Sequence, residues 1–449
     1  MASDEAGVRS LREACLHWSD AHGEKDSLSF GVAGAQIRHE IRSAFVAQGL
    51  LSAGPFARLA RQKSASAWCW SMTDNLAFSG KRLESTLRPR ALMTLVMCKE
   101  LPDNCRRISQ NFSTAVKSGL KQTVQKSEMN IPRLNFAHLP TPIEALPRLS
   151  EALRGPRLLI KRDDQTGLAF GGNKTRKLEF LVAEARDQGA KTLISGGALQ
   201  SNHCRQTAAA AARFGFECIL VLTGDKLQQA SGNLLLDQLF GAQIVYVADR
   251  KDRDSILQEA FEQATKEGKK PYLVPYGGSN ATGALGYAFA MKELIDQNVG
   301  ADWIVFATSS GGTHAGLLLG QRVFGFSGKV LGISVDESEE WLKQEVSQLA
   351  SATGEKAGER IEFTPPDVLA NANYCGAGYG VVTEQEREAI RLFAEYEGLL
   401  LDPVYTARAA AGMIDLIRKG FFKTSDTVMF LHTGGQPALF ADQYADKFR

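Results

Sequence analysis

The sequence predicts an α/β protein with mostly parallel sheets, helices on both sheet faces, and two lobes around a cleft. Three observations lead to this prediction. From Pro132 onward, short apolar runs of strand length alternate with segments of helical spacing, which is the pattern of βαβ units. Glycine-rich turns follow several of the apolar runs. The alternation continues for about 320 residues, which is enough chain for two such lobes.

The elements can be followed along the chain. Apolar runs of strand length occupy residues 158–160, 192–194, 219–222, 244–247, 272–274, 303–306, 330–335 and 428–431. Helical spacing is found at residues 173–188, 202–214 and 234–239. In the first of these helices Leu178, Leu181, Val182 and Ala185 share one face, so this face is expected to be buried.

The composition excludes several classes of protein. The formal net charge is only +2 over 449 residues, so neither nucleic acid nor a membrane is an expected partner. No uninterrupted apolar run approaches the roughly 18 to 20 residues that span a bilayer. The seven cysteines include no Cys-x-x-Cys pair, and a reducing compartment is expected. Asp163 and Asp164 lack partner ligands at useful spacing, so no metal is predicted.

Residues 1–128 do not share the alternating pattern. They include three of the five tryptophans, and residues 86–127 are rich in Lys and Arg and poor in acids. This composition predicts a poorly ordered or targeting-like N-terminal extension, or else a separate interaction module. We therefore expect the catalytic unit at residues 129–449. A cytoplasmic location is the default, with a mitochondrion or plastid as the alternative.

Three glycine-rich turns are candidates for anion binding. They lie at residues 195–202, 308–316 and 432–435, each after a predicted strand, where open parallel sheets bind ligands. The first two also open predicted helices, whose free N–H groups and dipole hold phosphate or carboxylate. None has the pattern of a P-loop or of a nicotinamide dinucleotide site. Such turns can also simply cap helices.

Lys174 is the candidate nucleophile. It follows Gly171 and Gly172 at the predicted start of a helix, where the helix dipole disfavours an ammonium group. A neutral amine is what Schiff-base chemistry requires. From spacing alone, a solvated cluster of basic side chains is the alternative interpretation.

Residues 171–180, Gly-Gly-Asn-Lys-Thr-Arg-Lys-Leu-Glu-Phe, closely resemble a segment of a known enzyme family. In D-cysteine desulfhydrases and 1-aminocyclopropane-1-carboxylate (ACC) deaminases this segment carries the lysine that binds pyridoxal phosphate (PLP). Further segments resemble the same family in order and spacing, at residues 200–208, 277–280, 402–405 and 432–435. The resemblance covers residues 132–449.

This resemblance implies the tryptophan-synthase-β-like PLP fold (fold type II), a homodimer, and PLP as the cofactor. Lys174 would bind the cofactor covalently and move the Cα proton of the substrate. Asn202 would hydrogen-bond the phenolic oxygen of the cofactor. The phosphate would be held by Ser310, Gly311, Gly312 and Thr313, with help from Lys177.

The resemblance also implies which residues meet the substrate. Ser201 would lie near the substrate carboxylate at a helix N-terminus, and Tyr379 and Tyr405 would face the substrate. The chain departs from the family at Ser309, where glycine is common. That departure affects the local loop conformation rather than the choice of cofactor.

Two positions bear on the reaction. ACC deaminases have glutamate after the Asp-Pro-Val-Tyr tyrosine and leucine in the His-x-Gly-Gly turn, whereas this chain has Thr406 and Thr433. A carboxylate would keep the pyridine nitrogen of the cofactor protonated and the ring a strong electron sink, and a hydroxyl leaves a weaker sink. The weaker sink is sufficient for β-elimination. The resemblance therefore implies a small amino-acid substrate, D-cysteine, which is converted to pyruvate, hydrogen sulfide and ammonia.

Other functions remain open at this stage. L-Cysteate sulfo-lyases resemble the chain through the same segments, and the two threonines do not separate them from D-cysteine desulfhydrases. An added basic residue on the substrate side would favour a sulfonate, and His203, His314 and Arg205 are candidates. ACC deamination is the third alternative. A non-catalytic PLP-binding protein is the alternative from another class, although it would not need the tyrosines.

Overall fold

A computed structural model describes residues 131–375 and 377–448 of the chain. The predicted N-terminal extension, residues 1–128, lies outside the described residues, so that division of the chain stays a prediction. Within the described ranges no helix is long and apolar enough to cross a membrane.

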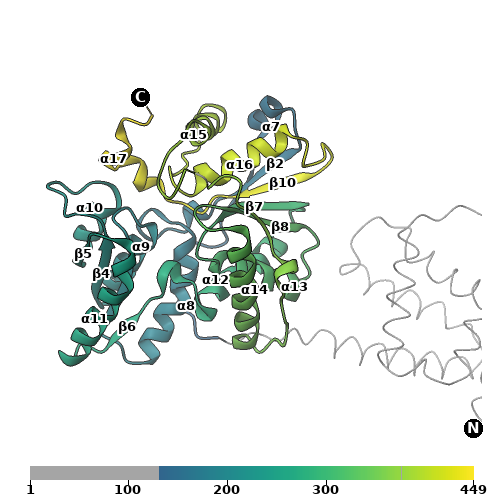
Figure 1. Ribbon diagram of the computed structural model, residues 1–449. Helices are drawn as coiled ribbons and strands as arrows, with labels where there is room; N and C mark the ends of the chain where they lie inside the picture. Colours follow the sequence, from purple (N-terminus) through teal and green to yellow (C-terminus); the bar gives the residue numbers. More distant parts are fainter. Residues whose placement is uncertain (1–130, 376, 449) are drawn as a thin grey trace, which may run out of the picture. The chain divides into compact units, whose positions relative to one another are not determined.

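The larger of two sheets has six strands (Figure 1). Their order is β1 (Ile143–Ala145), β2 (Arg157–Lys161), β10 (Thr427–Leu431), β7 (Trp303–Thr308), β8 (Lys329–Ser334) and β9 (Leu369–Asn371). Only β1 runs antiparallel to its neighbour, and the other pairs are parallel. The mostly parallel α/β fold predicted from the sequence is therefore confirmed.

The smaller sheet has four parallel strands. Their order is β5 (Gln243–Val247), β4 (Glu217–Thr223), β3 (Thr192–Ala198) and β6 (Pro271–Leu273). One detail differs from the prediction, because Gly196 and Gly197 lie inside β3 and not in the turn after it. Glycine is needed there, since a Cβ on Gly197 would lie 2.6 Å from the Ser201 hydroxyl oxygen.

Helices cover both faces of each sheet. In the larger lobe α7 (Pro147–Leu153), α15 (Glu384–Glu397) and α16 (Thr406–Arg418) cover one face, and α12 (Ala281–Asp296), α13 (Gly312–Phe324) and α14 (Glu339–Lys356) cover the other (Figure 1). The smaller lobe has α8 (Asn173–Asp187), α9 (Asn202–Phe214), α10 (Gly232–Leu239) and α11 (Arg253–Lys266). A short α17 (Asp442–Ala445) lies near the C-terminus.

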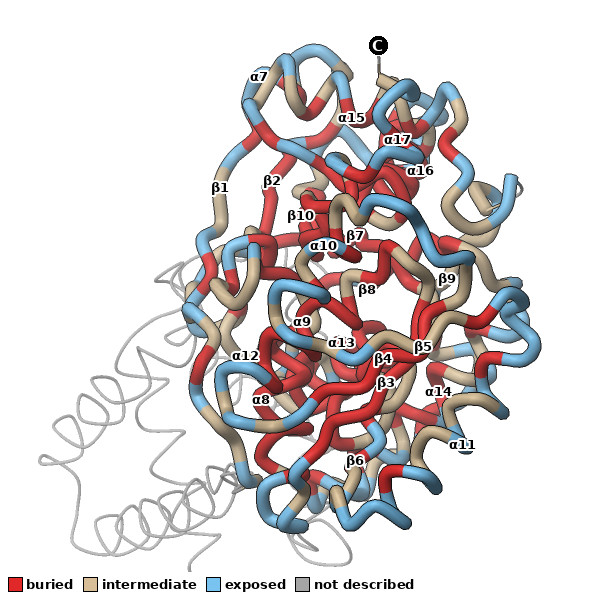
Figure 2. The backbone as a smooth tube through the Cα atoms, turned by 90° about the vertical axis from the view of Figure 1, so that its left-hand side faces the viewer, coloured by how far each residue is buried: buried red, intermediate tan, exposed pale blue. Residues whose placement is uncertain are grey.

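The two faces of each strand supply separate cores. In β10, Val428 and Phe430 pack with α15 and α16, whereas Met429 and Leu431 pack with α12 and α13. This is the period of two expected for a strand covered on both faces. The central strands of both sheets are accordingly buried along most of their length (Figure 2).

The predicted apolar face of the lysine helix is confirmed. Leu178, Leu181, Val182 and Ala185 of α8 are fully buried in the core of the smaller lobe. Because Lys174 lies at the N-terminal end of this helix, burial of this face fixes the position of the lysine backbone relative to β3 and β6.

Candidate functional site

The candidate site lies where β3 of the smaller sheet and β7 and β10 of the larger sheet end. After β3 the chain turns into α9, after β7 it turns into α13, and after β10 it runs through the 432–435 turn. The N-terminus of α8 adds Lys174 to this group of turns. The carboxyl edge of parallel strands is where α/β folds bind ligands.

Lys174 contacts the backbone of the turn that follows β6. Its Nζ donates to the carbonyl oxygen of Gly277 at 3.0 Å. Loss of hydration lowers the pKa of this lysine to about 8. The amine is thus much closer to its neutral, nucleophilic form at physiological pH than an ordinary lysine is.

Lys177 lies one helical turn further along α8 and donates to the same carbonyl. Its Nζ is 3.0 Å from the Gly277 oxygen and 3.3 Å from the Ser279 hydroxyl. Burial, followed by the charge of Lys174, holds the pKa of Lys177 well below its usual value. Among the described residues no carboxylate forms a salt bridge with either lysine. Two neighbouring amines without a counter-ion make a site that favours a bound anion.

The start of α13 faces these lysines. Gly311 has φ = 78°, and the Ser279 hydroxyl accepts from the Gly312 N–H at 3.1 Å and contacts the Ser310 hydroxyl at 2.8 Å. A Cβ on Gly312 would lie 2.5 Å from that Ser279 oxygen and 2.9 Å from the Lys177 Nζ. The backbone therefore approaches the lysine closely, as a phosphate-binding turn at a helix N-terminus requires.

Thr313 completes this turn. Its hydroxyl accepts from the Asn173 side-chain amide at 3.1 Å, which joins the first turn of α13 to the first turn of α8. The predicted phosphate residues and the predicted lysine are thus brought together by the structure.

Asn202 and Ser201 occupy the start of α9. Ser201 is the N-cap, and its hydroxyl accepts from the Cys204 N–H at 3.2 Å. The Asn202 Oδ1 accepts from Arg205 at 3.0 Å and from Asn233 at 2.8 Å. With its oxygen occupied, the Asn202 side chain presents its Nδ2 donor, as a contact with the phenolic oxygen of PLP requires.

The two threonines differ in their surroundings. The Thr406 hydroxyl donates to the Asp402 carboxylate at 2.7 Å and accepts from the Asp402 N–H at 2.7 Å. It is therefore fully occupied within the start of α16. The Thr433 hydroxyl has no hydrogen bond to the described residues, and only its backbone carbonyl is used, by the Asn173 N–H at 3.0 Å. Of the two, Thr433 is the hydroxyl that remains available to a ligand.

Tyr379 and Tyr405 form a pair. Their hydroxyl oxygens lie 2.9 Å apart, and their rings meet edge to face at an interplanar angle of 76°. Burial raises the pKa of both phenols well above the usual value. Tyr379 raises the pKa of Tyr405 further, whereas the hydrogen bond with Tyr405 partly offsets the rise at Tyr379. Both groups therefore stay protonated across the physiological range and can serve as hydrogen-bond donors.

Sequence reasoning missed several charged and aromatic neighbours of this pair. Burial raises the pKa of Tyr276, and so does the nearby carboxylate of Asp336. The guanidinium of Arg253 lies over the Tyr276 ring at 4.5 Å. Arg250 lies 3.7 Å from the buried Asp336 carboxylate, which has no hydrogen bond to any residue that the structure describes. Tyr276 could have been found from the sequence, because it directly precedes segment 277–280, which resembles the enzyme family.

The three basic candidates for a substrate contact have structural partners or buried surroundings. His203 shares a hydrogen bond of 2.9 Å with the Ser195 hydroxyl. Because that hydroxyl donates to the Val274 carbonyl at 2.9 Å, His203 must donate from Nε2. His314 is fully buried, and burial lowers its pKa to about 3. Arg205 donates to Asn202 and to the Gly171 carbonyl, the latter at 2.8 Å.

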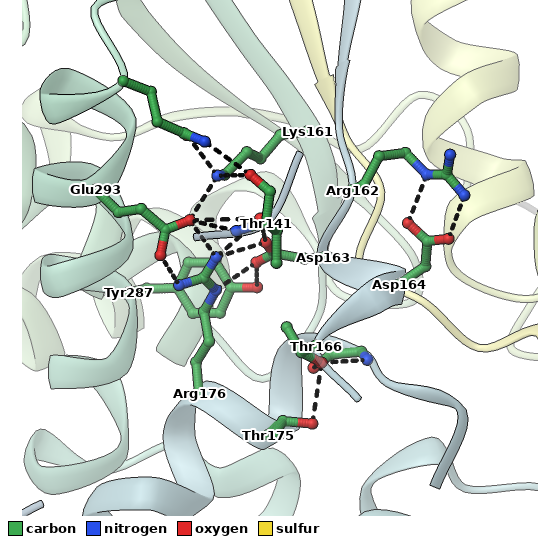
Figure 3. A network of polar contacts seen from close by, with 12 residues as sticks. Thr141, Lys161, Arg162, Asp163, Asp164, Thr166, Thr175, Arg176, Tyr287 and Glu293 are labelled. Atoms are coloured by element: carbon green, nitrogen blue, oxygen red, sulfur yellow. Dashed lines mark hydrogen bonds and ion pairs between the residues drawn. The ribbon is translucent and has the colours of Figure 1, made fainter. Parts of the chain in front are cut away.

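A buried ionic network holds α8, the helix that carries Lys174, against its neighbours (Figure 3). Arg176 makes a bidentate pair with Asp163, with both contacts at 2.8 Å, and also contacts Glu293 at 2.9 Å. Tyr287 donates to the same Asp163 carboxylate at 2.6 Å. Although burial opposes it, the Arg176 charge holds the pKa of Asp163 below its usual value. The network ties α8 to α12 and to the chain that follows β2.

The comparisons with known proteins agree with this geometry. Residues 134–434 match the model of the family described as pyridoxal-phosphate dependent enzyme. An ACC deaminase homologue of known structure is 37% identical, with a TM-score of 0.65, over 71% of this chain and 96% of the other.

Two more distant structures share the fold alone. The processed form of threonine deaminase isoform 2 from Solanum lycopersicum is 18% identical, with a TM-score of 0.51, over 70% of this chain and 83% of that chain. A fungal L-serine ammonia-lyase from Rhizomucor miehei is also 18% identical, with a TM-score of 0.51, over 70% and 99%.

Fold and site together define a PLP-dependent enzyme of fold type II. The chain belongs to the pyridoxal-phosphate dependent enzymes and, within them, to the family of ACC deaminases and D-cysteine desulfhydrases. Its cofactor is PLP. The paired lysines without a counter-ion and the close approach of Gly312 fit the phosphate of this cofactor, and the lowered pKa of Lys174 fits its aldehyde.

Proposed function

We propose that the protein catalyses β-elimination of D-cysteine, with water, to pyruvate, hydrogen sulfide and ammonia. The observation that carries the proposal is the contact between the Tyr379 and Tyr405 hydroxyls at 2.9 Å. Two phenols that stay protonated are suited to hydrogen-bond a thiolate as it leaves Cβ.

Each residue has a defined task in this proposal. PLP, when bound, supplies an electron sink for the charge that develops at Cα. The Lys174 amine removes the Cα proton as general base. Ser201, at the N-terminus of α9, binds the substrate carboxylate, and one phenol of the tyrosine pair donates to the departing sulfur. Lys177 and the turn 310–313 hold the phosphate, and Asn202 holds the phenolic oxygen.

The surroundings of the two threonines support elimination over ring opening. The Thr433 hydroxyl is available and uncharged, and Thr406 does not offer a free group because Asp402 occupies it. Neither side chain supplies the carboxylate that would keep the pyridine nitrogen protonated. This argues for the weaker electron sink, which is adequate for loss of a thiolate.

A second candidate is L-cysteate, which would lose sulfite in the same elimination. Arg253 favours it, because its buried guanidinium lies against Tyr276, beside the tyrosine pair. The carboxylate of Asp336 opposes it, since a buried acid near the same phenols disfavours an anionic substituent. We therefore place L-cysteate second.

The test is a keto-acid assay on the purified PLP-loaded protein with D-cysteine, L-cysteine, L-cysteate and ACC side by side. Pyruvate with sulfide from D-cysteine alone is the expected result. Pyruvate with sulfite from L-cysteate would move the function to the second candidate, and 2-oxobutanoate from ACC would contradict the argument from the threonines. Lys174→Ala is the matched control and should release no keto acid. A protein that turns over none of the four would favour the non-catalytic alternative.

A further inference from the structure

Arg408 is a buried arginine that sequence motifs do not single out. It is the third residue of α16 and lies three positions after Tyr405. Its side chain is only 1% exposed, and its Nε donates to the Glu386 carboxylate at 2.8 Å. A buried ion pair of this kind is weak evidence for stability as such, so its other contacts indicate what it does.

The remaining contacts of Arg408 all reach backbone carbonyls. Its Nη1 donates to Val335 at 2.6 Å and to Gly378 at 3.0 Å, and its Nη2 donates to Val381 at 2.8 Å. Gly378 and Val381 stand on either side of Tyr379 in the chain. One guanidinium therefore binds both ends of the short segment that carries this tyrosine.

That segment has little structure of its own. Residues 377–383 contain no helix or strand, and Gly378 and Gly380 have φ values of 92° and 74°. Val381 is 48% exposed, so packing does not fix it. A glycine-containing loop of this kind has many accessible conformations, and external contacts must select the one in which Tyr379 meets Tyr405.

We propose that Arg408 is a positioning residue that holds the Tyr379 loop so that the Tyr379 hydroxyl stays against that of Tyr405. Because Arg408 lies in the first turn of α16 and Tyr405 is the N-cap of that helix, the guanidinium places one tyrosine relative to the other through a rigid element. A planar group with five N–H donors suits this task, since it reaches several fixed acceptors at once. The role in catalysis rests on the proposed function, whereas the clamping of the loop does not.

The first readout is hydrogen exchange of the 377–383 segment in the PLP-loaded protein without substrate. Arg408→Met should raise exchange in this segment and leave the strands of both sheets protected. Arg418→Met is the matched control, because Arg418 lies on the same helix in an exposed pair with Glu388, and it should change nothing. Unchanged exchange of the 377–383 segment in Arg408→Met would overturn the proposal.

The second readout is a double-mutant cycle on kcat/KM with whichever of the four amino acids is turned over. Arg408→Met should lower kcat/KM by about 100-fold, the scale of a misplaced catalytic group, and to the level of Tyr379→Phe. Adding Tyr379→Phe should then cause no further loss, because both changes remove the same interaction. Losses that multiply would show that Arg408 acts independently of Tyr379 and would contradict the proposal.

Two more variants distinguish loosening of the 377–383 segment from unfolding of the whole protein. Arg408→Met with Glu386→Gln removes both buried charges, and glutamine still serves in the capping box that Glu386 forms with Thr383. This double variant should bind PLP normally and still show a loosened loop. Arg408→Lys should recover part of kcat/KM, since an ammonium reaches fewer of the three carbonyls. The exchange readout needs no substrate, so failure of the proposed function and failure of this inference give different results.

Discussion

Lys174 and Lys177 donate to the same acceptor, the carbonyl oxygen of Gly277, and each Nζ lies 3.0 Å from it. Two amines that share one neutral oxygen repel each other when both are charged. In the proposed function, the Lys174 amine binds the aldehyde of the cofactor and the Lys177 amine binds its phosphate. Burial lowers the pKa of both lysines, and the charge of Lys174 lowers the pKa of Lys177 further.

The first prediction concerns the pH dependence of cofactor capture. Since the pKa of Lys174 is lowered to about 8, its neutral form appears at lower pH than in an ordinary lysine. The rate at which the cofactor-free protein binds PLP should rise about fivefold from pH 7 to pH 8 and level off near pH 9. Stopped-flow absorbance measures it. A rate that keeps rising tenfold per pH unit to pH 10 would mean an ordinary lysine.

The second prediction separates the two lysines. Lys177→Met should weaken PLP binding by about 10- to 100-fold, because it removes a charged hydrogen bond to the phosphate. Pyridoxal, which lacks the phosphate, is the matched ligand and should bind the variant and the parent protein equally. Equilibrium titration by fluorescence gives both constants. Equal loss for the two ligands would place Lys177 away from the phosphate.

The third prediction compares the two threonines. Thr406→Val should lower the free energy of unfolding by about 1–3 kcal/mol, because it leaves buried groups of Asp402 without partners. Thr433→Val should leave stability within about 0.5 kcal/mol and instead change the absorbance spectrum of bound PLP. Urea unfolding and spectroscopy make the comparison. The reverse assignment would show that Thr406 faces the cofactor.

The fourth prediction concerns the ionic network behind α8. Asp163→Asn should lower the free energy of unfolding by about 3–5 kcal/mol, since it leaves the Arg176 charge buried with one partner fewer. Glu384→Gln is the control, because it breaks only exposed pairs, with Arg387 and Arg391, and should cost about 1 kcal/mol or less. Similar effects of the two changes would mean that the network does not anchor the lysine helix.

Much of the scaffold could be predicted because its signals are local. The face of α8 that carries Leu178 and Leu181 follows from helical spacing, and it is buried as expected. The positions of Lys174 at a helix start and of the turns 308–316 and 432–435 after strands follow from the same patterns. Because β7 and β10 are parallel neighbours, the two turns that follow them lie at the same edge of the larger sheet.

The rest depends on contacts between segments far apart in the chain. Nothing in the pattern around Arg408 indicates that it reaches Val335 and Val381. Tyr276 and Arg253 meet because α11, which begins at Arg253, packs across the smaller sheet against β6, although β5 and β6 are its opposite edges. Position in the chain predicts a cofactor contact for the Thr406 hydroxyl, and no local pattern indicates that Asp402, four residues earlier, occupies it. The roles of the site residues, the homodimer, the cellular location and the nature of residues 1–128 stay predictions.

The most direct test of the account is to locate the lysine that carries PLP. Borohydride reduction of the PLP-loaded protein, followed by digestion and mass spectrometry, fixes the cofactor covalently to that lysine. The account predicts modification of Lys174, with Lys177 unmodified although it shares the Gly277 carbonyl. Modification of Lys177, or of a lysine outside α8, would contradict it.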